Sequence, residues 1–391
     1  MNILISGAGI AGPTLAWWLA EAGYRPTIVE SAPEPRTGGY IIDFWGKGFD
    51  IAEKMGLGPE LMDAAYHVKE VRIVGRDGQR VGGFPADIFA RSTEGQFVSL
   101  PRGELSAAIN RAVSDRAETV FGDRIASMED DGDSIGVTFD NGAPRRFDMV
   151  IGAEGLHSPT RARVFGPAEQ FQLYLGFKFA AYVVDDYLPK DPDIYLSHSA
   201  PGLQASRFTL RDGSALVLLI YIDDAGPEMP DGEDAEKARL RELFGDMGWE
   251  VPAMLDALDR CRDLYLDTVS QVRMNNWSKG RVALIGDAVA GPSFLAGQGS
   301  ALAMIEAYVL AGELKHAGGN HEAAFAAYEA LLQPFLAKKQ KAALKFAGAF
   351  APRTRFGILA RNLVTRAMGI GWVADWAMGA GLTDEIELPD Y

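Results

Sequence analysis

The hydrophobic pattern at the N-terminus predicts a strand, a tight turn, a helix and a second strand within thirty residues. Residues 2–6 form a short apolar run, residues 13–22 have a helical pattern that Gly23 ends, and residues 25–30 again favour a strand. Further apolar runs at 68–74, 125–128 and 148–151 indicate strands, and residues 103–117 indicate a helix between them. Strands and helices that alternate in this way are typical of an α/β sheet.

The pattern changes between about residues 170 and 225. This stretch is rich in Phe, Tyr, Val and Leu, alternates with polar residues and contains the turn signals Pro201-Gly202 and Asp212-Gly213. It predicts an antiparallel sheet inserted into the α/β frame. The pattern is helical from residue 234 to residue 258, a strand pattern returns at 282–285, and helix is expected from Gly299 to about Gly381.

Composition narrows the classes of protein that the chain can belong to. Its 391 residues are enough for roughly two or three domains. The formal net charge of −15 argues against a nucleic-acid partner, which normally meets a basic face. Cys261 is the single cysteine, so no intrachain disulfide can form, which fits a cytoplasmic location. No apolar run approaches the roughly 20 residues of a membrane-spanning helix, and the N-terminus lacks the pattern of a secretory signal.

The strongest local motif is the glycine turn from Gly7 to Gly12, because a strand precedes it and a helix follows it. Gly7 allows the tight turn, Gly9 lets the backbone approach a pyrophosphate, and Gly12 lets helix and strand pack closely. The helix N-terminus offers free N–H groups to the phosphates. Glu30 ends the next strand, where a carboxylate binds the ribose hydroxyls of an adenosine. The predicted cofactor site also includes Ile10, Ala11 and Ser31.

A second strand, loop and helix occurs near residue 280. A buried strand pattern ends in Gly286-Asp287, and the next helix begins near Gly299. Asp287 can accept hydrogen bonds from a sugar-like chain, and the positive end of the helix can stabilise negative charge on a reduced ring. For Asp287 alone, a structural cap explains the residue equally well. Gly297, Gly299 and Ser300 are further candidates for cofactor contact.

With these motifs, the chain resembles the group A flavoprotein monooxygenases, the family of para-hydroxybenzoate hydroxylase and the tetracycline-inactivating monooxygenases. Residues 148–161 are similar to the family motif implicated in FAD and NAD(P)H binding, which implies roles for Asp148, Glu154 and Gly155. The segment around Arg102 is similar to one whose arginine contacts FAD. Arg36 and Gly39 match positions near the flavin and the nicotinamide donor.

The resemblance implies an α/β fold, with a Rossmann-type FAD-binding domain, an inserted antiparallel-sheet substrate domain and C-terminal helices. The expected FAD-binding domain is discontinuous and comprises residues 1–70, 96–168 and 274–318. Residues 71–95 and 169–273 would form the substrate domain, and residues 319–391 a C-terminal helical segment.

The implied activity is oxygenation of an aromatic or polycyclic small molecule with FAD, NADPH or NADH, and O2, by way of a flavin C4a-hydroperoxide. The chain would act as a monomer or homodimer, and no residue stands out as a general acid or base. A dehydrogenase or reductase on the same fold, and a flavin-binding or ligand-binding protein without turnover, remain alternatives.

Two departures from the family pattern affect the substrate more than the cofactor. Glu154 replaces the usual Asp, and residues 289–294 replace a histidine and paired prolines beside the flavin ring. Candidate substrate contacts combine flat apolar walls with a few polar groups. They are Phe177, Phe179, Tyr195, Gln204, Arg207, Tyr221, Pro292 and Phe294.

Two other catalytic patterns are rejected. Gly132-Asp-Ser134-Ile-Gly136 matches a hydrolase nucleophile motif, but it lies in an acidic turn between short strands, with no helix after it. The five histidines show no metal-ligand spacing, so no metal is expected.

Overall fold

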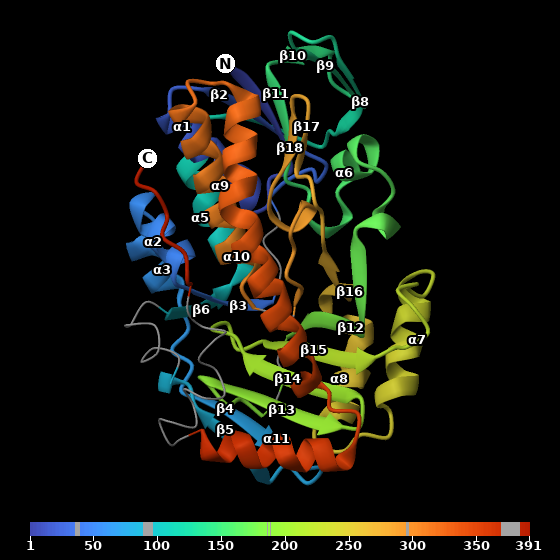
Figure 1. Cartoon of the computed structure of the whole chain (residues 1–391). Coiled ribbons are helices and arrows are strands. Elements are labelled where there is room, and N and C mark those ends of the chain that lie inside the picture. Colours follow the sequence, from blue (N-terminus) through green and yellow to red (C-terminus); the bar gives the residue numbers. More distant parts are fainter. Residues whose placement is uncertain (36–39, 89–96, 186, 188, 295–296, 369–383) are drawn as a thin grey trace.

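The computed structural model describes residues 1–35, 40–88, 97–185, 187, 189–294, 297–368 and 384–391. Its first layer is a six-stranded sheet in the order β17-β18-β11-β1-β2-β7 (Figure 1). The strands are β1 (Asn2–Ser6), β2 (Arg25–Glu30), β7 (Glu118–Phe121), β11 (Met149–Gly152), β17 (Ser278–Lys279) and β18 (Val282–Leu284). All neighbours pair in parallel except β17 with β18. Their continuous apolar runs suit a parallel sheet that is buried on both faces.

Helices cover this sheet and enclose the largest core of the described residues. They are α1 (Ala11–Glu21), α2 (Lys47–Lys54), α3 (Gly58–Ala64), α5 (Arg102–Val113), α9 (Gly299–His316) and α10 (His321–Phe350). α9 packs against both α1 and α10, and almost all its side chains are buried. α10 continues past the sheet toward the second layer (Figure 1). None of the helices formed by the described residues is long and apolar enough to cross a membrane.

The second layer is a seven-stranded sheet in the order β16-β12-β15-β14-β13-β4-β5. Its strands are β4 (Glu70–Val74), β5 (Arg80–Pro85), β12 (Gln172–Val184), β13 (Ile194–Ala200), β14 (Leu203–Thr209), β15 (Ala215–Ile222) and β16 (Arg262–Val272). All neighbours are antiparallel except β13 and β4. The antiparallel sheet expected over residues 170–225 is therefore confirmed, and a strand pair from residues 70–85 completes it.

The helical pattern expected over residues 234–258 is confirmed, but the chain breaks it between residues 245 and 250. The chain forms α7 (Glu233–Phe244), α8 (Val251–Asp256) and a short 3-10 helix (Ala257–Arg260), which pack on one face of the large sheet. The break occurs because residues 245–250 turn toward the β4–β5 hairpin. The N–H of Trp249 donates to the carbonyl of Arg76 at 2.7 Å, and Trp249 adopts a φ of 58°. A side chain at Gly248 would lie 2.0 Å from Arg76.

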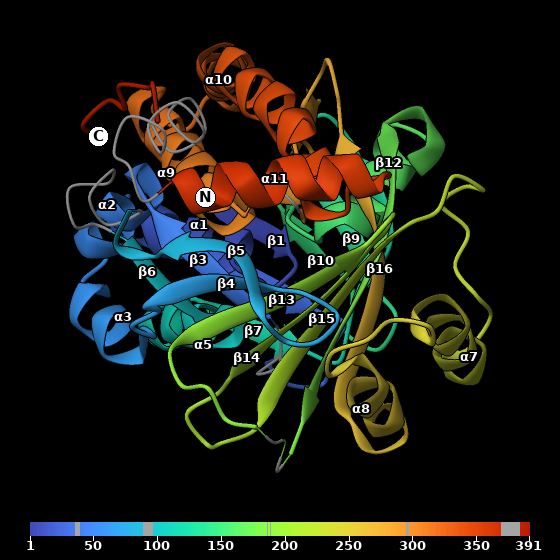
Figure 2. The same ribbon diagram turned by 90° about the horizontal axis from the view of Figure 1, so that it is seen from below.

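The last described helix, α11 (Arg355–Ala367), lies across the outside of the large sheet (Figure 2). α11 packs against β5 and β13, and it leaves Phe356, Leu359 and Leu363 exposed. The expected helix beyond residue 368 falls largely on residues 369–383, outside the described part of the chain.

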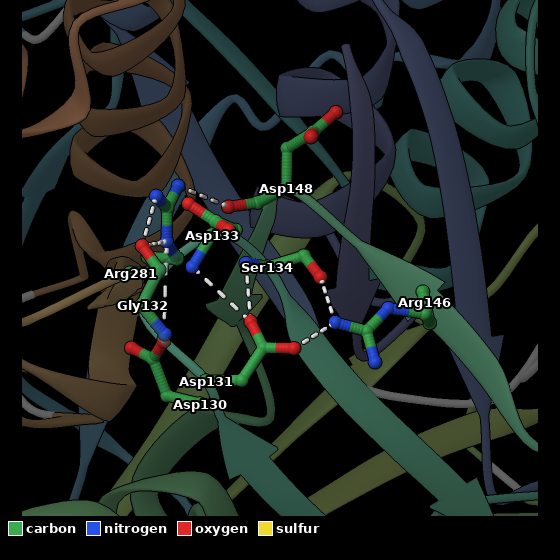
Figure 3. A network of polar contacts seen from close by, with 8 residues as sticks. All are labelled: Asp130, Asp131, Gly132, Asp133, Ser134, Arg146, Asp148 and Arg281. Atoms are coloured by element: carbon green, nitrogen blue, oxygen red, sulfur yellow. Dashed lines mark hydrogen bonds and ion pairs between the residues drawn. The ribbon is translucent and has the colours of Figure 1, made fainter.

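Two small sheets complete the fold. β3 (Ile41–Trp45) pairs with β6 (Phe97–Pro101), and the other sheet contains β8 (Ile125–Asp130), β9 (Ile135–Phe139) and β10 (Arg145–Phe147). Ser134 lies in the turn between β8 and β9, and its hydroxyl accepts a hydrogen bond from Arg146 at 2.5 Å (Figure 3). β9 follows directly, so the strand-to-helix context of a nucleophile elbow is missing, as the sequence indicated.

Candidate functional site

A cavity of about 710 Å³ extends from the β1–α1 turn to the large sheet. One end is lined by the carboxyl ends of β1 and β2, together with residues that follow β11 and β18. The other end is lined by side chains of β3–β6 and β13–β15. The edge of a parallel sheet at which the strands end is where such folds bind nucleotides.

The glycine turn has the geometry of a pyrophosphate cradle. Gly7 has a φ of 111°, and a Cβ there would lie 2.6 Å from the carbonyl oxygen of Ala153. A Cβ on Gly12 would lie 2.0 Å from the carbonyl oxygen of Gly7. At Gly9 the nearest atom to such a Cβ is the Arg102 guanidinium, 3.8 Å away, so the backbone faces open space. That space is of the kind that a phosphate group would fill.

Glu30 supports this turn and faces the cavity. Its Oε2 accepts a hydrogen bond from the N–H of Ala8 at 2.8 Å, and its Oε1 accepts one from the N–H of Ala32 at 2.9 Å. Oε1 also accepts a hydrogen bond from the Ser31 hydroxyl at 3.2 Å, whereas Oε2 keeps a second lone pair for a ribose hydroxyl. Ser31, Ile10 and Ala11 also line the cavity.

Arg102 and Asp287 bring opposite charges to the middle of the cavity. Arg102 begins α5, and its N–H donates to the carbonyl of Tyr40 at 3.0 Å. Asp287 follows β18 and lines the cavity. Burial raises the pKa of the Asp287 carboxyl, and the Arg102 charge opposes that rise. Gly297, Gly299 and Ser300 line the cavity at the start of α9, where no side chain caps the helix.

A buried carboxyl behind Asp287 was missed by the sequence analysis. Glu306, on α9, is 1% exposed, and its Oε2 accepts hydrogen bonds from the Gly286 N–H at 2.7 Å and the Tyr328 hydroxyl at 3.2 Å. Burial raises the pKa of Glu306 to about 8. This residue fixes the turn that carries Asp287, and only its apolar surroundings on α9 could have indicated it.

The segment after β11 is tied to the segment after β18. Glu154 accepts hydrogen bonds from Ser158, at 2.6 Å, and from Thr160, and burial raises the pKa of its carboxyl. Arg161 is 1% exposed and donates to the carbonyl of Ala288 at 2.9 Å. Glu154 and Gly155 both line the cavity. This arrangement holds the two predicted cofactor segments side by side.

Asp148 is not brought to the cavity. It precedes β11, whereas the cavity lies beyond the other end of that strand, and its carboxylate accepts a hydrogen bond from the Asn2 N–H at 2.6 Å. Arg36 and Gly39 lie outside the described residues. Among the described residues, no three His, Cys, Asp or Glu side chains form a cluster that could hold a metal ion.

The family comparison agrees with this geometry. Residues 1–338 match the FAD binding domain family. The chain belongs to this FAD-binding family. The resemblance to group A flavoprotein monooxygenases is thereby confirmed, and FAD is the cofactor that the site holds.

Several relatives of this FAD-binding chain are flavin-dependent monooxygenases. An uncharacterized protein of Mycobacterium tuberculosis is 36% identical over 346 residues, covering 87% of this chain and 91% of that protein. A flavin-dependent monooxygenase of Legionella longbeachae is 32% identical over 356 residues, covering 87% of each. The crystal structure of tetracycline destructase Tet(55) superposes with a TM-score of 0.85 at 32% identity, covering 100% of this chain and 98% of that one. The chain is accordingly an FAD-dependent monooxygenase.

The substrate candidates of this monooxygenase divide between the two faces of the large sheet. Tyr195 and Phe294 line the cavity, and Phe179 stacks on Phe294 with ring centroids 3.9 Å apart. Phe177 packs behind them in the same apolar cluster. Pro292 does not line the cavity, and its carbonyl accepts a hydrogen bond from Gln271 at 2.8 Å.

The other three candidates do not line the cavity. Arg207 is fully buried on the opposite face, where it pairs with Glu250 and with Asp191 at 2.6 Å. Tyr221 packs on α7 against Phe244. Gln204 is buried and donates to Ser206 at 3.2 Å. The expectation failed for Arg207 and Tyr221 because successive side chains of a strand point to opposite faces.

The residues that line the substrate end instead follow from strand register. Ser206 pairs with Leu218, and Tyr195 pairs with Val71, so each pair shares a face. The sequence alone does not give this register. The cavity residues that sequence reasoning missed include Tyr40, Asp43, Val71, Phe84, Ser99, Ser206, Phe208, Leu216, Leu218 and Phe350.

Proposed function

We propose that the enzyme uses NADPH or NADH together with O2 to insert one oxygen atom into an aromatic or polycyclic small molecule. The observation that carries this proposal is the continuity of the cavity, which runs from the glycine turn to a chamber with apolar and aromatic walls. A reduced flavin at the middle of the cavity would therefore face both a nucleotide-binding end and a sheltered organic substrate.

Roles for individual residues follow from their positions. Gly7, Gly9, Gly12 and Glu30 would hold the pyrophosphate and the adenosine ribose, and Asp287 would accept hydrogen bonds from the sugar-like chain. When bound, FAD supplies the redox chemistry, by accepting electrons from the nicotinamide and activating O2. Arg102 and the N-terminus of α9 would stabilise negative charge near the ring. The apolar chamber excludes water from the reacting atoms.

The nicotinamide would bind transiently, because the sequence holds only one glycine turn of the dinucleotide-binding type. We also propose a cytoplasmic location, supported by the single cysteine, Cys261. The quaternary state would be a monomer or a homodimer.

Product mass tests the proposal. Tetracycline is a reasonable first compound, because a solved relative at 32% identity is a tetracycline destructase. With NADPH and isotopically labelled O2, we expect a product that has gained one labelled oxygen atom. Loss of two hydrogen atoms would instead indicate a dehydrogenase. Absence of oxidation of both NADPH and NADH with tetracycline and with a panel of phenols would contradict the proposed function.

A further inference from the structure

Asp43 places a carboxyl group in the apolar end of the cavity. It lies in the middle of β3, opposite Ser99 on β6, and its Oδ1 accepts a hydrogen bond from the Ser99 hydroxyl at 2.5 Å. Its side chain lines the cavity, and among the described residues no hydrogen-bond partner meets the second carboxylate oxygen. One oxygen is thus held in place while the other faces the open chamber.

The surroundings of Asp43 make an isolated negative charge costly. Burial raises the pKa of the carboxyl, and the hydrogen bond from the Ser99 hydroxyl opposes this rise. Two other enclosed carboxylates in the described chain have cationic partners. Asp384 pairs with Lys339 at 2.8 Å, and Asp223 pairs with Lys178 at 2.9 Å. Asp43 has no such partner among the described residues, so its carboxylate can pair with a cationic group of a ligand in the cavity.

The walls around Asp43 suit a ring system. Val71, Phe84, Phe208 and Leu218 line the same part of the cavity and offer no charge. Tyr195 adds a hydroxyl close to Asp43, and burial together with the Asp43 charge raises the pKa of Tyr195 to about 12. Aromatic faces near a carboxylate favour a ligand that is both flat and cationic.

We propose that Asp43, held by Ser99, binds a protonated amine of the substrate, so that the substrate class is an amine-bearing aromatic or polycyclic compound. This inference rests on the proposed function. A neutral hydroxyl would donate a hydrogen bond to Asp43 but would leave its negative charge uncompensated. An ammonium group would donate hydrogen bonds and also compensate the charge. The net charge of −15 also raises the local concentration of cationic compounds.

Three catechols that differ only in the charge of their side chain test this inference by binding. Dopamine is cationic, 2-(3,4-dihydroxyphenyl)ethanol is neutral and 3,4-dihydroxyphenylacetate is anionic. Each would be titrated into the FAD-loaded enzyme, with the flavin absorption spectrum as the readout. We expect dopamine to bind at least about tenfold more tightly than the neutral catechol, and the anion to bind most weakly.

Asp43→Asn keeps the shape of the side chain and its bond from Ser99 but removes the charge. We expect it to abolish the preference for dopamine while the FAD content is unchanged. Asp50→Asn is the matched control, because Asp50 lies outside the cavity on α2 and its loss changes the net charge equally. In Asp50→Asn, the three catechols should bind in the same order of affinity as in the wild type. Ser99→Ala, as a second variant, should weaken dopamine binding by severalfold, because Asp43 loses its only fixed partner among the described residues.

Equal binding of the three catechols to the wild type, no dopamine binding at millimolar concentration, or a preference that survives Asp43→Asn would overturn the inference. These binding measurements do not require the enzyme to turn over any substrate. If the binding order holds but no compound is oxygenated, the proposed function fails and the amine site stands. If oxygen is inserted into compounds without an amine and the binding order is absent, only the amine site fails.

Discussion

The two ends of the cavity are built in different ways. The nucleotide end consists mainly of backbone from six consecutive residues, with Glu30 holding the N–H groups of Ala8 and Ala32. The substrate end consists mainly of side chains from seven strands, β3–β6 and β13–β15. A contiguous backbone site is fixed by local chemistry, whereas a site assembled from many strands depends on register. The first end could therefore be predicted from a local motif, whereas the second depends on how the strands pair.

The largest expected effect concerns the backbone of the nucleotide end. Gly9→Ala should fold normally, because the added Cβ has only one neighbour, at 3.8 Å, and Gly9 has an ordinary negative φ. The methyl group would nevertheless occupy the space of the pyrophosphate. We expect the Kd for FAD to rise at least about a hundredfold, as measured by flavin fluorescence titration.

Gly136→Ala is the matched control for this variant. Gly136 also has a single neighbour at 3.8 Å and no positive φ, but it lies on β9, away from the cavity. It should bind FAD as the wild type does. Normal FAD affinity in Gly9→Ala would mean that the turn does not contact the cofactor.

The next effect concerns Glu306, behind the middle of the cavity. Its pKa of about 8 lies above that of an unfolded glutamate, so the folded state retains a proton that the unfolded state has lost. Stability therefore falls as pH rises toward 8, and it is greatest below the unfolded pKa. Between pH 6 and 8 the wild type should lose about 2 kcal/mol of unfolding free energy to this group.

Glu306→Gln cannot titrate and should lack this component. Urea unfolding at pH 6 and pH 8 gives the free energy of unfolding of both proteins. The free energy of the variant, relative to that of the wild type, should increase as pH rises. An unchanged difference between the two pH values would show that Glu306 is not held neutral.

Glu30→Gln should weaken FAD binding by about tenfold. The amide replaces one acceptor oxygen with N–H donors, which face either a backbone N–H group of the turn or a ribose hydroxyl of the cofactor. Flavin fluorescence titration gives the Kd. A loss confined to stability, with FAD affinity intact, would limit Glu30 to a structural role in the turn.

The smallest effect is expected at Ser134, outside both ends of the cavity. Ser134→Ala removes only an exposed contact to Arg146, so the stability change should stay below about 0.5 kcal/mol and NADPH oxidation should be unaffected. Loss of activity in this variant would indicate that Ser134 has a catalytic role, which its position in the β8–β9 turn argues against.

The sequence predicted the nucleotide end well because its signals are local. The strand, turn and helix around Gly7 to Gly12 and the antiparallel character of residues 170–225 follow from periodicity and glycine spacing. Asp43 was missed because it lies in a short apolar strand, and nothing in the sequence shows that β3 pairs with β6 beside the cavity. Arg207 was misplaced because the face of β14 depends on its register with β15.

The most direct test of FAD-dependent oxygenation is the visible spectrum of the purified enzyme, before and after anaerobic addition of NADPH or NADH. We expect a flavin spectrum that bleaches with a nicotinamide and returns when air is admitted. A flavin that neither nicotinamide reduces, with or without an aromatic compound present, would contradict the proposed oxygenation. A protein that binds no flavin even after FAD is added would contradict the account at its foundation.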